Sequence, residues 1–322
     1  MINSRNEWTK LRKVVVGSAT GARIPAMDTS LRTVNYANLT TVDHVRSGLY
    51  PNRVIDEANE DLESLCQFLV GQDVEVLRPL EYNPQYYHYC PRDTVLVHGN
   101  RSIATPMSLA ARFDEWRSLA QHLPGLELAP NQQGDNLYDQ SCLGNPNRLA
   151  LRELAPKFDA ANIIRADDDL LYLVSNSGNI AGAKWLAETL GPAAKVHLLQ
   201  GVYSYMHIDS TVAFLRQGLM LCNPARIKSK DQLPAVFRNW DVIWCADPVD
   251  IGHYPGYCNA SEWINMNLFS ISPDLVVLEE HQHPLRKQLE SQGINCAMLS
   301  MRHQRTLGGG FHCVTLDLVR DA

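Results

Sequence analysis

The sequence predicts a mixed α/β fold built from about five repeats of a strand–strand–helix–strand unit. Apolar runs come in pairs separated by two or three polar residues, as at 211–215 and 219–222. Such closely spaced pairs are typical of β-hairpins. Helical stretches follow several of these pairs, and glycine often stands just beyond the helix end. Because strands alternate with helices while hairpins join neighbouring strands, we expect mixed sheets and not purely parallel ones.

Five units can be traced along the chain. The clearest runs from apolar segments at 163–164 and 170–174 through a helix at 181–190 to a strand at 196–199. The other four are expected at these positions: strand 13–17, helix 55–70, strand 74–77; strand 93–97, helix 110–120, strand 126–128; strands 211–215 and 219–222, a helix-like stretch to 239, strand 242–244; strands 267–271 and 275–278, helix 284–292, strand 296–299. Five like units close most simply into a pseudo-symmetric ring, so we expect one domain over residues 1–322.

Two long, turn-rich segments, 20–51 and 137–155, interrupt this pattern. Loops of that length in a compact fold are usually functional or mobile. We therefore expect both segments to be insertions in the ring.

Composition excludes several classes of protein. The chain has 322 residues, 45% of them hydrophobic, and a formal net charge of −6. An acidic chain without basic runs argues against a nucleic-acid or membrane-surface partner, and no apolar stretch is long enough to span a bilayer. The eight cysteines are dispersed without a Cys-x-x-Cys pair, and the N-terminus has no apolar signal segment. We expect reduced thiols, no zinc site and a cytoplasmic location.

The most informative segment is the glycine run 308–310, which leads into Phe311, His312 and Cys313. Glycine permits positive φ angles and the close approach of other groups. A thiol between such a turn and the next strand is well placed to be an exposed nucleophile, the alternative being a buried structural cysteine. Because side chains alternate along a strand, we expect His312 to point away from Cys313 and to serve in packing.

Polar residues precede the first strands of several units, and a ring would bring them to a common centre. They are Asp93, Asp159, His207 with Asp209, and Cys313. An imidazolium activates a cysteine, histidine exchanges protons near neutral pH, and a carboxylate orients the histidine ring. Taken singly, each aspartate is better explained as a turn or capping residue, so the prediction rests on their association with the histidine and the cysteine.

Several aspartates around one thiolate would repel it unless a cation binds between them. A planar guanidinium carries five N–H donors and a permanent charge, which suits a set of carboxylates. We therefore expect an arginine-like substrate that is attacked at its central carbon by Cys313.

Two other motifs are weaker. The glycine-containing segment 17–21 follows a strand but lacks the lysine of a P-loop and the spacing of a dinucleotide-binding loop. His281 and His283 have the spacing of metal ligands, yet no third ligand is visible nearby in the sequence. A solvated turn explains the two histidines better.

At these residues the chain resembles the arginine-dependent amidinotransferases, which have the pentein or α/β-propeller fold. The resemblance covers nearly the whole chain and is carried by the segments 89–93, 158–162, 182–185, 207–211, 223–226 and 307–313. It implies a ping-pong transfer of the amidino group of L-arginine to an acceptor amine, with release of L-ornithine. It also implies small-molecule substrates and no metal or organic cofactor.

The resemblance assigns roles residue by residue. It makes Cys313 the nucleophile that carries the amidino group, His207 the acid and base, and Asp159 the partner of that histidine. Asp93 and Asp209 would hold the guanidinium of the donor.

Arg226, with Ser261 as a weaker match, would hold the α-carboxylate of the donor. The chain departs from the arginine:glycine enzyme at Ser204 and Tyr205, just before the catalytic histidine, and at Ala260, where that enzyme has the first of two serines. These departures fall where the acceptor should bind. The acceptor therefore stays open, in natural-product or guanidino-compound biosynthesis.

Two alternatives remain at this point. One is a guanidine hydrolase of the same fold, in which water takes the place of the acceptor, ammonia leaves in place of ornithine, and citrulline forms. The other is a catalytically silent protein that only binds an arginine-like ligand. The oligomeric state also stays open, with a homodimer as one alternative.

Overall fold

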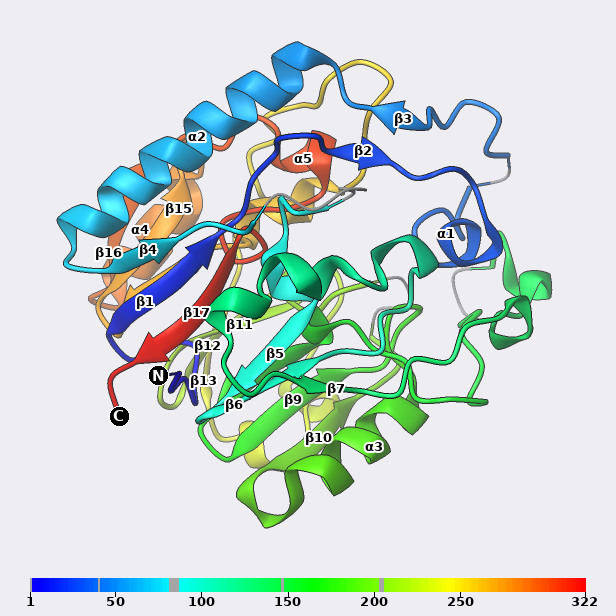
Figure 1. The fold of residues 1–322 in the computed structure, drawn as a ribbon. Coiled ribbons are helices and arrows are strands. Elements are labelled where there is room, and N and C mark those ends of the chain that lie inside the picture. Colours follow the sequence, from blue (N-terminus) through cyan, green and yellow to red (C-terminus); the bar gives the residue numbers. More distant parts are fainter. Residues whose placement is uncertain (1, 40, 81–86, 146–147, 203–205) are drawn as a thin grey trace.

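The computed structural model describes residues 2–39, 41–80, 87–145, 148–202 and 206–322. Its strands form five three-stranded sheets arranged in a ring, together with one two-stranded sheet (Figure 1). In each three-stranded sheet the central strand is antiparallel to the first strand of its unit and parallel to the third. The predicted five units and their mixed sheets are thereby confirmed.

The strands fall into three sets by their place in the unit. The first strands are β17 (Thr315–Arg320), β5 (Val95–His98), β8 (Ile163–Ala166), β11 (Val212–Arg216) and β14 (Phe269–Ser272). The central strands are β1 (Leu11–Val16), β6 (Arg101–Ala104), β9 (Asp169–Leu173), β12 (Leu219–Cys222) and β15 (Leu275–Glu279). The third strands are β4 (Glu75–Leu77), β7 (Glu127–Leu128), β10 (Lys195–Leu199), β13 (Asp241–Trp244) and β16 (Asn295–Leu299).

The two ends of the chain close the ring together. The C-terminal strand β17 pairs antiparallel with β1, with Val16 opposite Thr315 and Val14 opposite Asp317. The first unit therefore takes its first strand from the end of the sequence, and the two termini lie close together (Figure 1). This closure brings Cys313 into the ring. A single domain over residues 1–322 stays a prediction.

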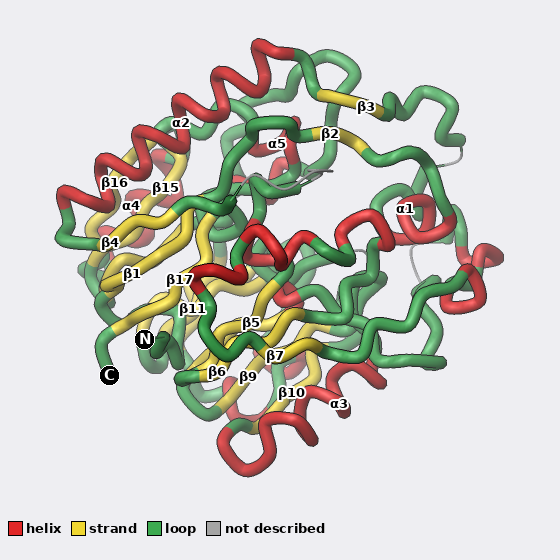
Figure 2. Tube along the Cα trace, viewed as in Figure 1, coloured by secondary structure: helices red, strands yellow, loops and turns green. Residues whose placement is uncertain are grey.

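Three of the five predicted helices are present, and they connect the central strand of a unit to its third strand. They are α2 (Asn52–Gly71), α3 (Ile180–Leu190) and α4 (His283–Ser291). Residues Val54, Ala58, Leu62, Leu65 and Leu69 of α2 are buried, which is the spacing of one helix face. Helices α2 and α3 cover the outer side of the sheets (Figure 2).

The other two predicted helices are wrong. The segment 110–120 forms short 3₁₀ turns, and so does the stretch before Asn239. In the second case Pro234 lacks an amide hydrogen and restricts the residue before it, which breaks a helix. In the first case the turns direct the side chains of Arg112 and Glu115 inward, where they form a buried ion pair 2.7 Å long. Tertiary pairing here overrides local helix preference.

The centre of the ring is charged and buried. Arg165 on β8 binds Glu7 and Asp317, with the shortest N–O distances at 2.8 Å and 2.7 Å. Asp317 on β17 also binds Arg92 and Arg320, each at 2.7 Å. Buried charges are tolerated only when paired in this way, and removal of one partner is strongly destabilising. The network therefore joins the N-terminal segment to the first strands of several units.

The two predicted insertions contain little regular structure. Segment 20–51 contains β2 (Arg23–Ile24) and β3 (Gly48–Leu49), which pair with each other, and the short helix α1 (Thr29–Val34). Segment 137–155 contains only 3₁₀ turns and loops among its described residues. The remaining helix, α5 (Gln304–Leu307), ends at the glycine run. Among the described helices, none is both long and apolar enough to cross a membrane.

Candidate active site

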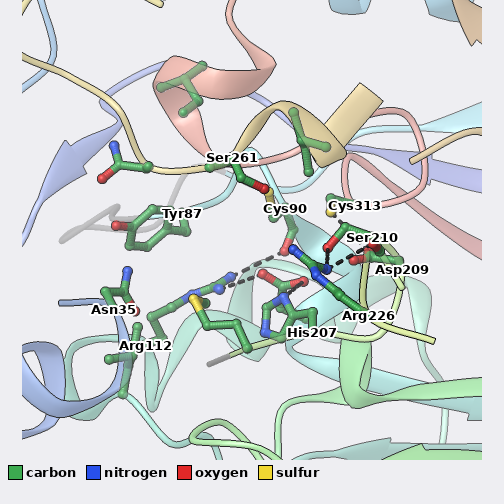
Figure 3. A pocket seen from close by; sticks show the side chains of 18 residues that line it. Asn35, Tyr87, Cys90, Arg112, His207, Asp209, Ser210, Arg226, Ser261 and Cys313 are labelled. Atoms are coloured by element: carbon green, nitrogen blue, oxygen red, sulfur yellow. Dashed lines mark hydrogen bonds and ion pairs between the residues drawn. The ribbon is translucent and has the colours of Figure 1, made fainter. Parts of the chain in front are cut away.

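Most of the predicted site residues line one cavity. Six of the seven do so directly: Asp93, His207, Asp209, Arg226, Ser261 and Cys313 (Figure 3). Asp159 is fully buried and reaches the cavity through its hydrogen bond with His207. The cavity has a volume of about 90 Å³. A larger cavity of about 840 Å³ adjoins it and shares Arg226 and Ser261 with it.

The ring explains how these residues meet. Each of the five units places one polar side chain two to four residues before its first strand: Asp93, Asp159, Asp209, Asn267 and Cys313. The sequence analysis missed Asn267. The position that singled out the three aspartates, just before the first strand of a unit, also points to Asn267, because Asn267 precedes β14 as Asp93 precedes β5.

Cys313 is buried and not exposed as the sequence predicted, with 2% of its surface accessible, although it lines the cavity. Asn267 holds it in place. The amide Nδ2 of Asn267 donates to the Cys313 sulfur at 3.2 Å, and its Oδ1 accepts from the backbone N–H groups of His312 and Cys313 at 2.9 and 3.2 Å. One side chain thus fixes both the sulfur and the backbone that carries it.

The three glycines before Cys313 have different tasks. Only Gly308 has a positive φ, +84°, at the end of α5. A Cβ on Gly309 would lie 2.5 Å from the sulfur of Cys90, and one on Gly310 would lie 2.8 Å from the Cβ of Asn267. Close approach, more than flexibility, therefore requires glycine at 309 and 310.

His207 lies between two aspartates. Its Nε2 is 3.0 Å from Asp159 Oδ2, and its Nδ1 is 3.6 Å from Asp93 Oδ1. The second oxygen of Asp159 accepts hydrogen bonds from the backbone N–H and the hydroxyl of Ser108, at 2.9 and 3.0 Å. Burial lowers the pKa of His207, but Asp93 and Asp159 outweigh burial and raise the pKa to about 9. His207 is therefore an imidazolium at neutral pH.

One carboxylate oxygen of Asp93 binds an arginine, and the other makes no hydrogen bond with the described residues. Arg112 binds its Oδ2 at 2.6 Å and also binds Glu115. The other oxygen, Oδ1, is buried and makes no hydrogen bond to any described residue. Leaving a buried acceptor unsatisfied is unfavourable, so this oxygen is suited to receive an N–H from a ligand. The sequence analysis missed Arg112, which the segment 110–120 presents only because it is not helical.

The thiol of Cys313 is protonated when the cavity holds no cation. A hydrogen bond with Cys90, burial, and the nearby Asp209 raise its pKa well above the usual value. A cation placed beside the sulfur would act in the opposite direction. Thiolate formation is therefore linked to the arrival of a positively charged ligand.

Asp209 accepts hydrogen bonds from two neighbouring residues of the final turn. Its Oδ2 lies 3.1 Å from the Cys313 sulfur and 3.2 Å from His312 Nδ1. His312 therefore has a polar contact with Asp209 that the expected packing role did not include. Residues 311–314 form a turn that precedes β17, so the alternation of a strand does not apply to them.

Arg226 lies at the border of the two cavities, in the turn after β12. Its Nη1 donates to the carbonyl and hydroxyl oxygens of Ser210, both at 2.8 Å, and to the hydroxyl of Thr211 at 3.0 Å (Figure 3). Ser261 faces both cavities just before a 3₁₀ turn. Ser204 and Tyr205, which the sequence analysis expects on the acceptor side, lie outside the described residues.

The two weaker motifs have structural explanations. A Cβ on Gly17 would lie 2.2 Å from the carbonyl oxygen of Tyr89, so this glycine allows two backbones to pass closely. The exposed ring of His281 bonds to Glu279 at 2.7 Å, beside the start of α4.

Comparison with known proteins gives the family. No family model matches the chain. Inosamine-phosphate amidinotransferase 1 of Streptomyces glaucescens is 42% identical over 343 residues, which cover 99% of this chain and 97% of that protein. The chain belongs to the amidinotransferase family. The resemblance recognised in the sequence is thereby confirmed.

Other amidinotransferases agree with this result. The L-arginine:L-lysine amidinotransferase of Pseudomonas savastanoi pv. phaseolicola is 30% identical, with 98% of this chain and 94% of that protein covered. The solved structure of the inosamine-phosphate amidinotransferase of Streptomyces griseus superposes with a TM-score of 0.93 at 38% identity, covering 100% of this chain and 97% of that one. Dimethylarginine dimethylaminohydrolase of Pseudomonas aeruginosa, at 15% identity and a TM-score of 0.62, shares the fold. The predicted pentein fold is therefore confirmed.

The raised pKa of His207 gives this amidinotransferase a testable pH dependence of stability. The pKa rises from 6.5 to about 9 on folding, so the stabilising contribution is complete below pH 6.5 and is lost as the pH rises through 9. We expect the unfolding free energy of the wild-type chain to fall by about 3 kcal/mol relative to His207→Asn across this interval. Urea unfolding of both chains at several pH values measures the difference. Parallel curves would contradict the charged state of His207.

Proposed function

We propose that this amidinotransferase takes its amidino group from L-arginine, carries it on Cys313, and passes it to an acceptor amine with release of L-ornithine. One observation carries the proposal. The sulfur of Cys313 and the imidazole of His207 line the same cavity as two carboxylates, one of which has a buried oxygen without a hydrogen-bond donor. A thiol, an acid and a receptor for a cation are the parts that this chemistry needs.

The donor guanidinium would lie between Asp93 and Asp209. The open Oδ1 of Asp93 accepts one N–H group, and Asp209 accepts another beside the sulfur. Asp209 is ionised for this task, because His312, His207 and Cys313 outweigh the effect of burial and lower its pKa to about 2. The bound cation lowers the pKa of the Cys313 thiol, which loses its proton to solvent as arginine binds.

The first half-reaction transfers the amidino group to the enzyme. The Cys313 thiolate attacks the central carbon of the guanidinium and forms a C–S bond. His207 gives its proton to the nitrogen that leaves, and the C–N bond breaks. Neutral ornithine amine, neutral His207 and a cationic amidino-cysteine result, so charge and protons balance.

The second half-reaction reverses these steps with a new amine. The acceptor attacks the amidino carbon, loses a proton to His207, and the C–S bond breaks. The Cys313 thiolate and the His207 imidazolium return. The same side chain serves as acid and then as base, which its position between Asp93 and Asp159 supports.

We infer that the acceptor enters from the larger cavity. This cavity adjoins the donor cavity and is bordered by the insertion 20–51, which contributes Tyr36 and Arg46. Its volume of about 840 Å³ far exceeds that of a small amino acid. A screen with labelled arginine and a panel of amino acids, diamines and aminocyclitols identifies the acceptor.

A hydrolase of the same fold is the competing activity, and a single experiment separates the two. Enzyme is mixed with a small excess of arginine and no acceptor. We expect about one equivalent of ornithine and a mass increase on Cys313, because the amidino group has nowhere to go. Steady release of citrulline would establish hydrolysis, and no adduct with no ornithine would indicate a silent binding protein.

Arg226 is expected to bind the α-carboxylate of arginine. Arg226→Ala should raise KM for arginine about 10- to 100-fold with kcat nearly unchanged, since a charge-assisted hydrogen bond contributes about 1.5–3 kcal/mol. Initial-rate kinetics measure the change, with Arg238→Ala as a control because that exposed arginine lines neither of these cavities. An unchanged KM in Arg226→Ala would reject the role.

We also place the enzyme in the cytoplasm, since its eight cysteines are free.

A further inference from the structure

His312 is held between two carboxylates. Its Nδ1 lies 3.2 Å from Asp209 Oδ2, and its Nε2 lies 3.4 Å from Glu7 Oε2. The side chain is 9% exposed. A carboxylate can only accept hydrogen bonds, so both contacts are made at once only by the doubly protonated ring. His312 is thus placed to bridge two buried carboxylates.

The buried ion pairs at the centre of the ring of sheets hold His312 through Glu7. Glu7 is bound through both of its oxygens by Arg165, at 2.8 and 2.9 Å, and Arg165 also binds Asp317. The backbone N–H of His312 donates to Asn267 at 2.9 Å. The imidazole of His312 therefore cannot rotate without disturbing Glu7 or the segment 311–314 that carries Cys313.

The side chain of His312 reaches the site through Asp209. It does not line the cavity that contains Cys313 and His207. It borders a separate space of about 10 Å³ on the other side of Asp209, together with Glu7. A single oxygen of Asp209, Oδ2, therefore contacts both the sulfur and the imidazole.

We propose that His312 is a positioning residue: it holds the Asp209 carboxylate charged and aimed at the sulfur of Cys313, so that the site selects a cationic carbon centre. The proposal rests on the proposed function. Without the imidazolium, Asp209 would be a buried anion close to Asp93 and to the thiolate, an arrangement that favours its protonation or displacement.

The test compares two thiol reagents on the resting enzyme. Chloroacetamidine carries an amidinium like that of the substrate, and chloroacetamide is its neutral counterpart with the same leaving group. The ratio of their rates of reaction with Cys313, followed by mass spectrometry of the intact protein, measures selection of a cation without any turnover. A merely structural role would slow both reagents alike.

Three variants separate the possible roles. His312→Leu removes both contacts, His312→Asn keeps an N–H donor at the position of Nδ1 toward Asp209, and His312→Gln keeps one at the position of Nε2 toward Glu7. We expect the reagent ratio to fall roughly 10- to 100-fold in His312→Leu, the effect of one charge-assisted hydrogen bond. His312→Asn should restore most of the ratio, while His312→Gln should not.

The outcomes distinguish this proposal from the proposed function. A wild-type enzyme that shows no preference for chloroacetamidine, or no reaction at Cys313, overturns the function itself. A clear wild-type preference that persists in His312→Leu overturns only the role of His312. If His312→Leu does not fold, the Asn and Gln variants decide, and equal ratios in those two overturn the proposal. KM for arginine should rise in the same order as the ratio falls.

Discussion

Replacement of Cys313 by alanine is expected to abolish amidino transfer while the fold is retained. The sulfur is the only atom that can carry the amidino group in the proposed mechanism, and loss of a nucleophile lowers kcat by about 10⁴-fold or more. The fold should survive because the sulfur makes few polar contacts, with Asn267 Nδ2 at 3.2 Å, Asp209 Oδ2 at 3.1 Å and the thiol of Cys90. Removal of a thiol leaves room for these groups to relax.

Ornithine release and the mass of the intact protein measure this effect together. Cys313→Ala should release no ornithine in a single turnover and show no mass increase with arginine. Cys296→Ala is a matched control, since that partly buried cysteine lies on β16 and lines neither cavity, and its sulfur is hydrogen-bonded to the backbone oxygen of Ile294. Circular dichroism and thermal unfolding confirm folding in both. Residual turnover in Cys313→Ala near the level of the control would refute the nucleophile.

Replacement of His207 by asparagine is expected to slow the first half-reaction about 100- to 10,000-fold with arginine, the usual contribution of a general acid. The ornithine nitrogen leaves as a strongly basic amine, so it needs the proton of the imidazolium. Asp93 and Asp159 keep that proton on the ring by raising the pKa of His207 to about 9. Asp159→Asn should slow the same step, since the ring then loses a charged partner at 3.0 Å.

A second amidino donor tests whether His207 acts as a general acid. S-methylisothiourea releases methanethiolate, a weakly basic leaving group that departs without protonation, yet it presents the same amidino carbon to Cys313. The rate of Cys313 modification by this donor should fall less than about tenfold in His207→Asn, because the acid contribution is no longer needed. His281→Asn is the control, since that histidine is exposed and remote in the sequence from every site residue. Equal losses with both donors would show that His207 orients the site without giving a proton.

The repeat of the fold could be predicted because its signals are local. The pairs Ile163–Ala166 with Asp169–Leu173 and Phe269–Ser272 with Leu275–Glu279 are hairpins whose spacing is visible in the sequence. The third strand of each unit followed from the next apolar run. The helix at 110–120 failed because the burial of Arg112 depends in part on Asp93, which lies in the 3₁₀ turn Pro91–Asp93 earlier in the chain. No local pattern reports such a pairing.

The site could be predicted in part, for a related reason. Asp93, Asp159, Asp209 and Cys313 stand just before first strands, and a ring brings those positions together. The same rule, applied to every unit, would have found Asn267. His312 was assigned to packing because the turn at 311–314 was taken as strand. Because the last strand was expected to start too early, the contact of His312 with Asp209 was not predicted.

The sequence by itself determined the repeating unit, the mixed sheets and the residue types available for chemistry, because apolar spacing and side-chain chemistry belong to short stretches of chain. Only the tertiary structure decided that Cys313 is buried and protonated, that Asp93 has one open oxygen, and that His312 joins Asp209 to the charged core. Those properties depend on burial and on partners that lie 19 to 305 residues away in the sequence, and the electrostatic environment of a group is set by what packs around it in space.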